Sequence, residues 1–246
     1  MNALRRMTWV ELKLFLREPA AVFFTLAFPV MVLLLFSSLF GNEPVQGFPD
    51  LKSVDVMAPA YTGMVIGTTA LLGLPIILAG YRQQGILRRL RATPLHPAMI
   101  LAAQVLVNLL MTIVGISILI VTAYFVYDLR LPDAPVSVTL AFIIATLSFF
   151  ALGFVLAGMA PSARTAQILG QVIFFPMFFL SGAAGIPREM FPDTLHRISD
   201  FLPLTYVVDL IQDLWIKGSW NLTALAVLLG LLIVSVAISA RTFRWE

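Results

Sequence analysis

Few residues in this sequence have the types and the spacing that enzyme chemistry needs. Asp209 and Asp213 form a DxxxD pair, and two such carboxylates could hold magnesium and a diphosphate in an intramembrane prenyltransferase. The sequence offers no second acidic cluster to complete that site. The solvated face of a helix is the simpler explanation of the pair.

Other catalytic and metal-binding patterns are missing from the sequence. The only lysines are Lys13, Lys52 and Lys217, and none of them ends a GxxxxGK[ST] phosphate loop. Neither His96 nor His196 belongs to an HExxH motif. The chain has no cysteine, which excludes disulfides, thiolate metal sites and thiol nucleophiles. We expect no catalytic residue, no metal site and no cofactor bound by this chain.

The densest group of charges is the stretch RQQGILRRLRATPLHP, residues 82–97. It holds four arginines, although charged residues make up only 12% of the chain against about a quarter in soluble domains. Apolar residues alternate with these arginines, and a Thr-Pro turn follows them. If this stretch served only to set the orientation of the chain in a membrane, that role would explain the charges but not the glycine, the turn or the apolar residues.

The elements that position these residues are membrane spans. The mean hydropathy is +0.95, and a hydrocarbon core needs about 20 apolar residues per helix. Uncharged runs of that length predict six spans, at residues 19–40, 56–81, 98–127, 136–163, 165–187 and 218–240. Residues 1–18 form a charged lead without a following small-residue cleavage site, so we expect the mature chain to keep all six. No ionisable side chain lies inside them, which argues against a proton-driven transporter.

Lysine and arginine residues set the predicted orientation. With a cytoplasmic N-terminus, eleven of them fall inside and five outside, as the positive-inside rule requires; the inside group is Arg5, Arg6, Lys13, Arg17, Arg82, Arg88, Arg89, Arg91, Arg164, Arg241 and Arg244. Both termini are therefore expected in the cytoplasm, and the cell membrane is the expected location. The net charge of +3 is a topological signal, so no nucleic-acid partner follows from it.

Two amphipathic regions flank the spans. Residues 1–18 predict a cytosolic surface helix with Arg6, Lys13 and Arg17 in a cationic stripe facing membrane lipids; an ordinary positive flank is the alternative. Residues 188–217 predict two short outer helices, because apolar residues recur at helical spacing on both sides of Pro203. We expect Leu210 and Leu214 of the second helix to seal the outer mouth of the protein.

Two strings support a resemblance to one family. QQGILRRLRATPLHPAMILAAQVL resembles the cytoplasmic coupling segment of ABC type-2 permeases, in which a polar residue and a glycine precede a short basic helix and Thr-Pro-Leu. FFLSGAAGIPREMFPDTLHRISDFLPLTYVVDLIQDLW is similar to the family pattern of Ser-Gly, an exposed proline, a short amphipathic helix and Pro-Leu-Thr-Tyr. Where the family often has a glutamate before its arginines, this chain has Ile86 to Arg88.

The resemblance implies an all-α transport subunit with six transmembrane helices in a single domain, residues 1–246. A separate ABC ATPase, which binds ATP and magnesium, is the implied partner. The implied coupling residues, within the loop 82–97, are Gly85, Ile86, Leu87, Arg88, Arg89, Leu90, Arg91, Thr93 and Pro94. The family pairs two permeases, identical or different, around a central cavity. By resemblance the first, second and fifth spans line it, with the candidates Phe24, Phe28, Thr68, Thr69, Gln167, Gln171, Phe174 and Phe178.

The substrate class remains open at this point. The sequence favours an exporter of amphipathic drugs, antibiotics or lipid-like molecules, of the multidrug-resistance type. A polysaccharide or glycolipid exporter is the alternative within the family. A channel that does not use ATP, or an intramembrane enzyme, is the alternative from another class.

Overall fold

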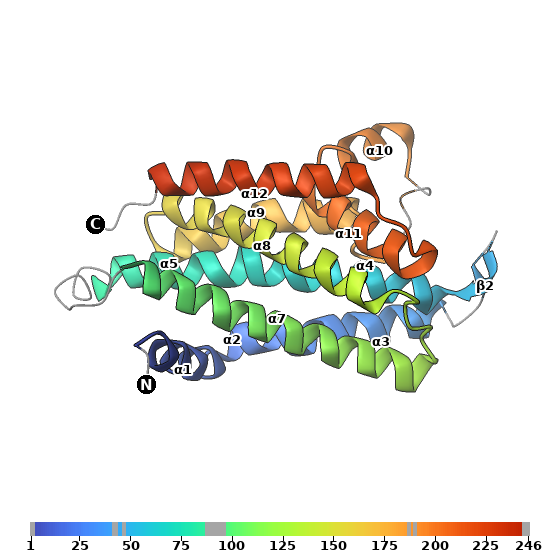
Figure 1. Cartoon of the computed structure of the whole chain (residues 1–246), viewed down its shortest axis with the longest axis horizontal. Helices are drawn as coiled ribbons and strands as arrows, with labels where there is room; N and C mark the ends of the chain where they lie inside the picture. Colours follow the sequence, from blue (N-terminus) through green and yellow to red (C-terminus); the bar gives the residue numbers. More distant parts are fainter. Residues whose placement is uncertain are drawn as a thin grey trace.

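The computed structural model describes residues 3–40, 44–45, 48–86, 97–185, 188 and 191–242. Most of them form helices whose long members run along one axis (Figure 1). In chain order the elements are α1 (Ala3–Leu16), α2 (Pro19–Val22), the π-helical segment η1 (Phe23–Ala27), α3 (Phe28–Phe40), β1 (Pro44–Val45), β2 (Phe48–Lys52), α4 (Ser53–Gly67), the π-helical segment η2 (Thr68–Gly73), α5 (Leu74–Gln83), α7 (Pro97–Tyr127), α8 (Pro135–Met159), α9 (Ala163–Leu180), α10 (Asp193–Ser199), α11 (Pro203–Gln212), the π-helical segment η4 (Asp213–Lys217) and α12 (Leu222–Thr242).

Within the described part of the chain, five helices are long and apolar enough to cross a membrane. They are Ser53–Gln83, Leu101–Tyr127, Pro135–Met159, Ala163–Leu180 and Leu222–Arg241. They correspond to the second to sixth spans expected from the sequence, and they confirm a helical membrane protein. The first expected span is helical from α2 to α3, but its apolar stretch, Phe23–Leu39, is shorter than the other five.

Several helix boundaries follow from local chemistry. Prolines stand at the first position of α2, α7, α8 and α11, where their missing N–H costs nothing. Ser162 caps α9 by accepting a hydrogen bond from the Thr165 N–H at 3.2 Å. The helix α9 ends at Leu180, before the expected end of the fifth span, because the chain turns over residues 181–185. The helix α12 starts at Leu222, where the Asn221 side chain accepts from the Ala224 N–H at 3.0 Å.

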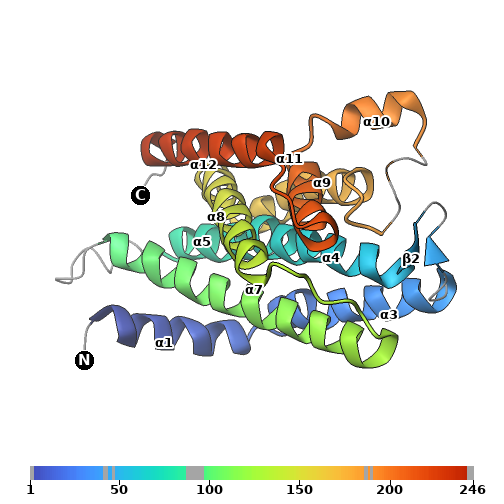
Figure 2. The ribbon, with the colours of Figure 1, turned by 45° about the vertical axis from the view of Figure 1, so that its right-hand side comes forward.

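The chain also contains a short β-hairpin that the sequence did not predict. Strands β1 and β2 pair in antiparallel fashion, with Val45 opposite Phe48. This hairpin joins α3 to α4 and lies with α10 at one end of the bundle (Figure 2). The helix α1, the end of α5, the start of α7 and the end of α12 lie at the opposite end (Figure 1). We call these the hairpin end and the α1 end.

The helix formed by α4, η2 and α5 is the centre of the bundle. In its apolar window 72% of the residues are buried, against 17% in α12, which is therefore peripheral. Neighbouring backbones approach η2 very closely. A Cβ atom added at Gly153 of α8 would lie 2.2 Å from the Ala70 carbonyl oxygen, and one at Gly170 of α9 would lie 2.2 Å from that of Leu71. Any side chain at either position would collide with the central helix.

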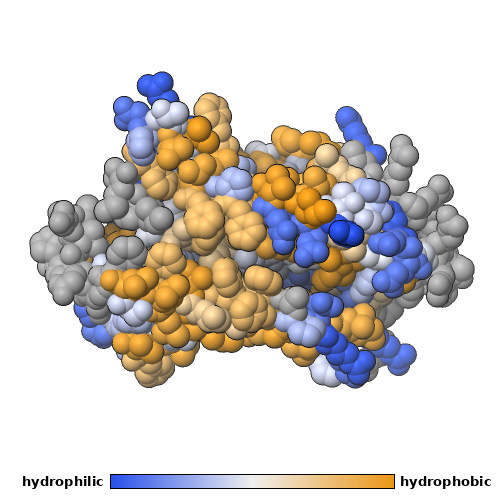
Figure 3. Space-filling model, turned by 180° about the vertical axis from the view of Figure 1, so that it is seen from behind, coloured by the Kyte–Doolittle hydropathy of each residue, from blue (hydrophilic) through white to orange (hydrophobic). Residues whose placement is uncertain are grey.

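The outer surface suits a membrane-embedded bundle. Large apolar side chains are exposed on α7, α9 and α12, including Phe125, Val172 and Ile233. Seen from behind, apolar side chains form a broad area across the middle of the molecule, with most hydrophilic ones nearer its ends (Figure 3). Such a band is expected where hydrocarbon replaces water as the solvent.

Candidate functional site

The α1 end contains the borders of the expected coupling segment. The helix α5 ends at Gln83, and Gly85 follows in a left-handed turn with φ of 66°, a conformation that favours glycine. The next helix, α7, begins at Pro97. Gly85 and Ile86 are described, whereas Leu87, Arg88, Arg89, Leu90, Arg91, Thr93 and Pro94 lie outside the described residues. Their coupling role stays a prediction.

The helix α1 packs against α7 and presents its cations outward. Arg6, Lys13 and Arg17 are all exposed, and the Lys13 ammonium lies 5.2 Å from the centre of the Trp9 ring, a cation–π distance. The buried side of α1 carries Phe15, which packs with apolar residues of α7. The helix thus has a buried side toward α7, and its three cations lie on the exposed side. Its contact with membrane lipids stays a prediction.

A buried carboxylate of α1 contacts both helices that flank the expected coupling segment, α5 and α7. Glu11 is only 6% exposed. Its Oε2 accepts hydrogen bonds from the Tyr81 hydroxyl of α5 at 2.5 Å and from the Gln104 amide of α7 at 2.6 Å. Asn108 continues this network by donating to the Gln104 backbone carbonyl at 2.9 Å. Burial raises the pKa of Glu11 above its ordinary value, and the two hydrogen bonds lower it by less.

The two residues that follow Tyr81 hold the turn between α8 and α9. The Arg82 guanidinium donates to the carbonyl oxygens of Gly158 and Ala160 at the end of α8. The Gln83 side-chain oxygen accepts from the Ala163 N–H, the first amide of α9, at 3.3 Å. Both contacts satisfy backbone groups that helix ends leave without partners.

The hairpin end has its own charged cluster. Arg188, whose side chain is 14% exposed, pairs with Asp200 near α10 and with Asp209 of α11, the latter at 3.0 Å. Burial raises the pKa of Asp209, and Arg188 opposes that shift. At another place, the exposed Asp128 pairs with Lys52 at 2.8 Å, which lowers the pKa of Asp128. The Arg188 pairs join parts of the outer segment to one another, and the Lys52 pair joins β2 to the loop after α7.

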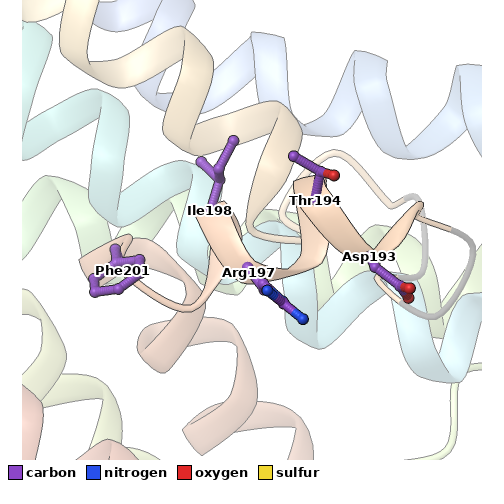
Figure 4. Close-up of a pocket in the computed structure, with 5 residues that line it drawn as sticks. All are labelled: Asp193, Thr194, Arg197, Ile198 and Phe201. Carbon is purple, nitrogen blue, oxygen red and sulfur yellow. The ribbon is translucent and has the colours of Figure 1, made fainter.

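A hollow of about 250 Å³ lies beside this cluster. Arg188 and Asp209 line it together with Gln212, which also donates to the Val56 carbonyl oxygen at 2.9 Å. A second hollow, of about 360 Å³, has as its described lining α10 and the turn after it, including Arg197 and Phe201 (Figure 4). Phe201 is 86% exposed, so this second hollow is an open groove on one short helix.

The DxxxD pair is not arranged to bind a metal. Asp209 faces Arg188, whereas Asp213 accepts hydrogen bonds from Lys217 at 2.7 Å and from Asn221 at 2.9 Å. Among the residues that the structure describes, no group of three or more His, Cys, Asp or Glu side chains could hold a metal ion. The prenyltransferase interpretation therefore gains no support from the geometry.

The predicted pathway residues separate into two groups. Thr68 and Thr69 are buried and both donate to the Val65 carbonyl oxygen of their own helix, at 3.0 and 2.9 Å. Phe174 and Phe178 are also buried, and their rings stack with centroids 5.5 Å apart. Phe24, Gln167 and Gln171 are exposed on the surface of the single chain, and Phe28 is half-buried. One chain does not bring the eight residues into one cavity, and their role stays a prediction.

Leu210 and Leu214, the predicted outer gate, are fully buried. They belong to the main apolar core and hold α11 and η4 in the bundle near α4 and α12. Two short helices, α10 and α11, lie within residues 188–217. Their position on the outer side of the membrane and the gating role of Leu210 and Leu214 stay predictions.

Comparison with known protein families agrees with this arrangement. The model of the family described as ABC-2 type transporter matches residues 2–215. The chain belongs to the ABC-2 type transporter family. It is thus the membrane subunit of a transport system, a multi-pass membrane protein that works with an ABC ATPase and is not that ATPase itself.

Individual relatives of this ABC-2 chain are distant. It is 25% identical over 205 residues to the protein named “Putative transport permease YvfS” of Bacillus subtilis. The aligned region covers 82% of this chain and 81% of that protein. It is 38% identical over 69 residues to nodulation protein J of Rhizobium leguminosarum, covering 28% of this chain and 26% of the relative. It is 23% identical over 177 residues to ABC transporter G family member 20 of Dictyostelium discoideum, covering 71% of this chain and 24% of the relative.

The sequence analysis missed the buried polar contacts beside the expected coupling segment. It noticed Arg82 only as one positive charge among many, and it did not single out Tyr81, Gln83 or Gln104. Glu11 gave a usable signal, since it is an acid among apolar neighbours in an amphipathic helix. Its partners come from helices that are 70 and 93 residues away in the chain, and periodicity within one helix cannot identify such partners.

Proposed function

We propose that this chain is the permease subunit of an ATP-driven exporter of amphipathic drugs, antibiotics or lipid-like molecules. The observation that carries the proposal is the family match, joined to the absence of a phosphate loop from the sequence. A permease without a nucleotide site has to receive work from a separate ATPase. Among the described residues, Arg5, Arg6, Arg17, Arg82, Arg164 and Arg241 lie in or next to helices at the α1 end, where the ATPase would bind.

A second permease completes the transport pathway in this proposal. The helix α9 exposes Gln167 and Gln171 beside the apolar Ile168 and Val172. Amides within a bilayer are expected to face protein or an aqueous cavity rather than lipid. A cavity formed between two permeases would give these amides such surroundings, and it would also cover the exposed Phe24. The six spans would then have both termini in the cytoplasm of the cell.

Purification of the tagged chain from its native membrane tests the proposal. We expect an ABC ATPase and a second permease, identical or different, to be recovered and identified by mass spectrometry. Leu87→Asp or Leu90→Asp should place a charge in an apolar groove of the ATPase, at a cost of several kcal/mol. These variants should insert normally and lose both the ATPase and drug-stimulated ATP hydrolysis.

Replacement of Arg88, Arg89 and Arg91 by Gln is the complementary experiment, since it removes the topological charges and keeps the apolar residues. If the leucine variants retain the ATPase while the Gln variant fails to insert, the segment is a topological signal and the coupling proposal is wrong. Transport of a fluorescent amphipathic dye in reconstituted vesicles, compared with that of a lipid-linked oligosaccharide, separates the two exporter classes.

A further inference from the structure

Three consecutive residues at the end of α5 contact three different parts of the bundle. Tyr81 donates to Glu11 of α1, Arg82 donates to carbonyl oxygens at the end of α8, and Gln83 accepts from the first amide of α9. Successive helical side chains point about 100° apart, so one turn of helix can reach in three directions. We propose that Tyr81, Arg82 and Gln83 form a junction that divides the movement of the coupling segment between two groups of helices.

This inference rests on the proposed function, because the junction has a task only if residues 82–97 are moved by an ATPase. The three residues adjoin that segment directly, since α5 ends at Gln83 and Gly85 begins the turn. A displacement of the segment relative to the membrane therefore acts on the junction through α5, and it acts on α7 through Pro97. They act as positioning residues, through helices that they hold and not through contact with a substrate.

The first arm of the junction leads from Tyr81 to α1 and α7. Both Tyr81 and Gln104 donate to the same oxygen of Glu11, at 2.5 and 2.6 Å, so the carboxylate bridges α5 and α7 as well as joining them to α1. Beyond this bridge, Phe15 of α1 packs against Val107 and Met111 of α7. Polar and apolar contacts together make α1 and α7 one body at this end.

The second arm leads from Arg82 and Gln83 to the turn between α8 and α9. Arg82 binds one side of that turn, at Gly158 and Ala160, and Gln83 binds the other side, at Ala163. Below these contacts Ala79 packs with Ala160 and Ala166 in a small apolar cluster, in which all three are fully buried. The positive charge of Arg82 also lies at the C-terminal end of α8, where the helix dipole is negative, so their interaction is favourable.

The arms can be separated by small substitutions. Tyr81→Phe removes one hydroxyl from the first arm and keeps the ring. Arg82→Gln removes the guanidinium from the second arm, and Gln83→Ala removes its acceptor. Gln84→Ala is the matched control, because Gln84 is exposed and its side chain makes no hydrogen bond with the described residues.

Site-specific reporters can follow each arm in the complete transporter. The chain has no cysteine, so a single cysteine can carry a fluorescent or spin label at Leu106 of α7 or at Gln167 of α9, both of which are exposed. The labelled chain is purified with its ATPase and reconstituted in vesicles, and the spectral change caused by ATP with vanadate is recorded.

We expect the unsubstituted chain and Gln84→Ala to respond at both reporters. Arg82→Gln and Gln83→Ala should reduce the change at Gln167 and keep that at Leu106. Tyr81→Phe should reduce the change at Leu106 and keep that at Gln167, and part of the Leu106 change should remain because α7 also joins the segment directly at Pro97. A purely structural weakening would reduce both signals together, and that result would contradict the junction. Equal responses in all variants would contradict the junction alone. No response at either reporter in the unsubstituted chain, despite a bound ATPase, would contradict the proposed function as well.

Discussion

At the scale of single residues, Glu11 is an ionisable side chain that the fold buries. The carboxylate is buried in the α1 end and accepts two hydrogen bonds at one oxygen. Burial raises its pKa above the ordinary value of 4.5. The folded chain therefore binds a proton there more tightly than the unfolded chain. The resulting stability is complete below the unfolded pKa and is lost as the pH rises through the folded pKa.

We expect Glu11→Gln to keep both hydrogen bonds, because the amide oxygen can accept from Tyr81 and Gln104. The unfolding temperature of the unsubstituted chain, relative to this variant, should increase as the pH falls from above the raised pKa of folded Glu11 toward its unfolded value. Glu11→Ala leaves the half-buried Tyr81 hydroxyl and the buried Gln104 amide without this acceptor, and the buried amide alone should cost about 1–3 kcal/mol. Glu18→Gln, at an exposed acid next to the same helix, is the control. A pH-independent difference between Glu11→Gln and the unsubstituted chain would contradict a titrating Glu11.

At the scale of elements, the outer helix α11 is part of the core and not an appendage. Leu210 is fully buried between α11 and its neighbours. Leu210→Ala should lower the free energy of unfolding by about 2–5 kcal/mol through lost contacts and a cavity. Phe201→Ala changes a larger side chain that is 86% exposed, and it should change stability by less than about 0.5 kcal/mol in detergent. Thermal unfolding of both variants measures the contrast, and equal losses would contradict the packing.

The elements also show which features a sequence pattern can predict. Apolar length predicted the helices from α4 to α12, and helical periodicity predicted α10 and α11 within 188–217. The β-hairpin was missed because its strands are only two and five residues long, too short for an alternating pattern to identify. The burial of Leu214 and the contacts of Arg82 depend on which helices become neighbours, and this information is absent from the periodicity of any single helix.

At the scale of the whole molecule, the arrangement of the bundle predicts a topology. The α1 end holds the start of α1 and the end of α12, and the hairpin end holds the charged outer segment (Figure 1). Single cysteines at Asp133 and Asp193 should react with an impermeant thiol reagent added outside the cell, and one at Arg164 should react only after permeabilisation. The absence of native cysteine provides a clean background. External labelling of Arg164 with protection of Asp133 would reverse the assigned orientation.

The contacts of Gly153 and Gly170 with η2 have a consequence for how this family can diverge. A methyl group at Gly153 would lie 2.2 Å from a backbone oxygen, and backbone cannot rotate away as a side chain can. Gly153→Ala should therefore destabilise the chain by about 1–3 kcal/mol, measured by thermal unfolding. Relatives that share only about a quarter of the aligned residues with this chain differ from it at most aligned positions. If they keep the same contacts between helices, glycine should persist at these two positions, and a larger residue there would mark a relative in which α8 or α9 has moved away from the central helix.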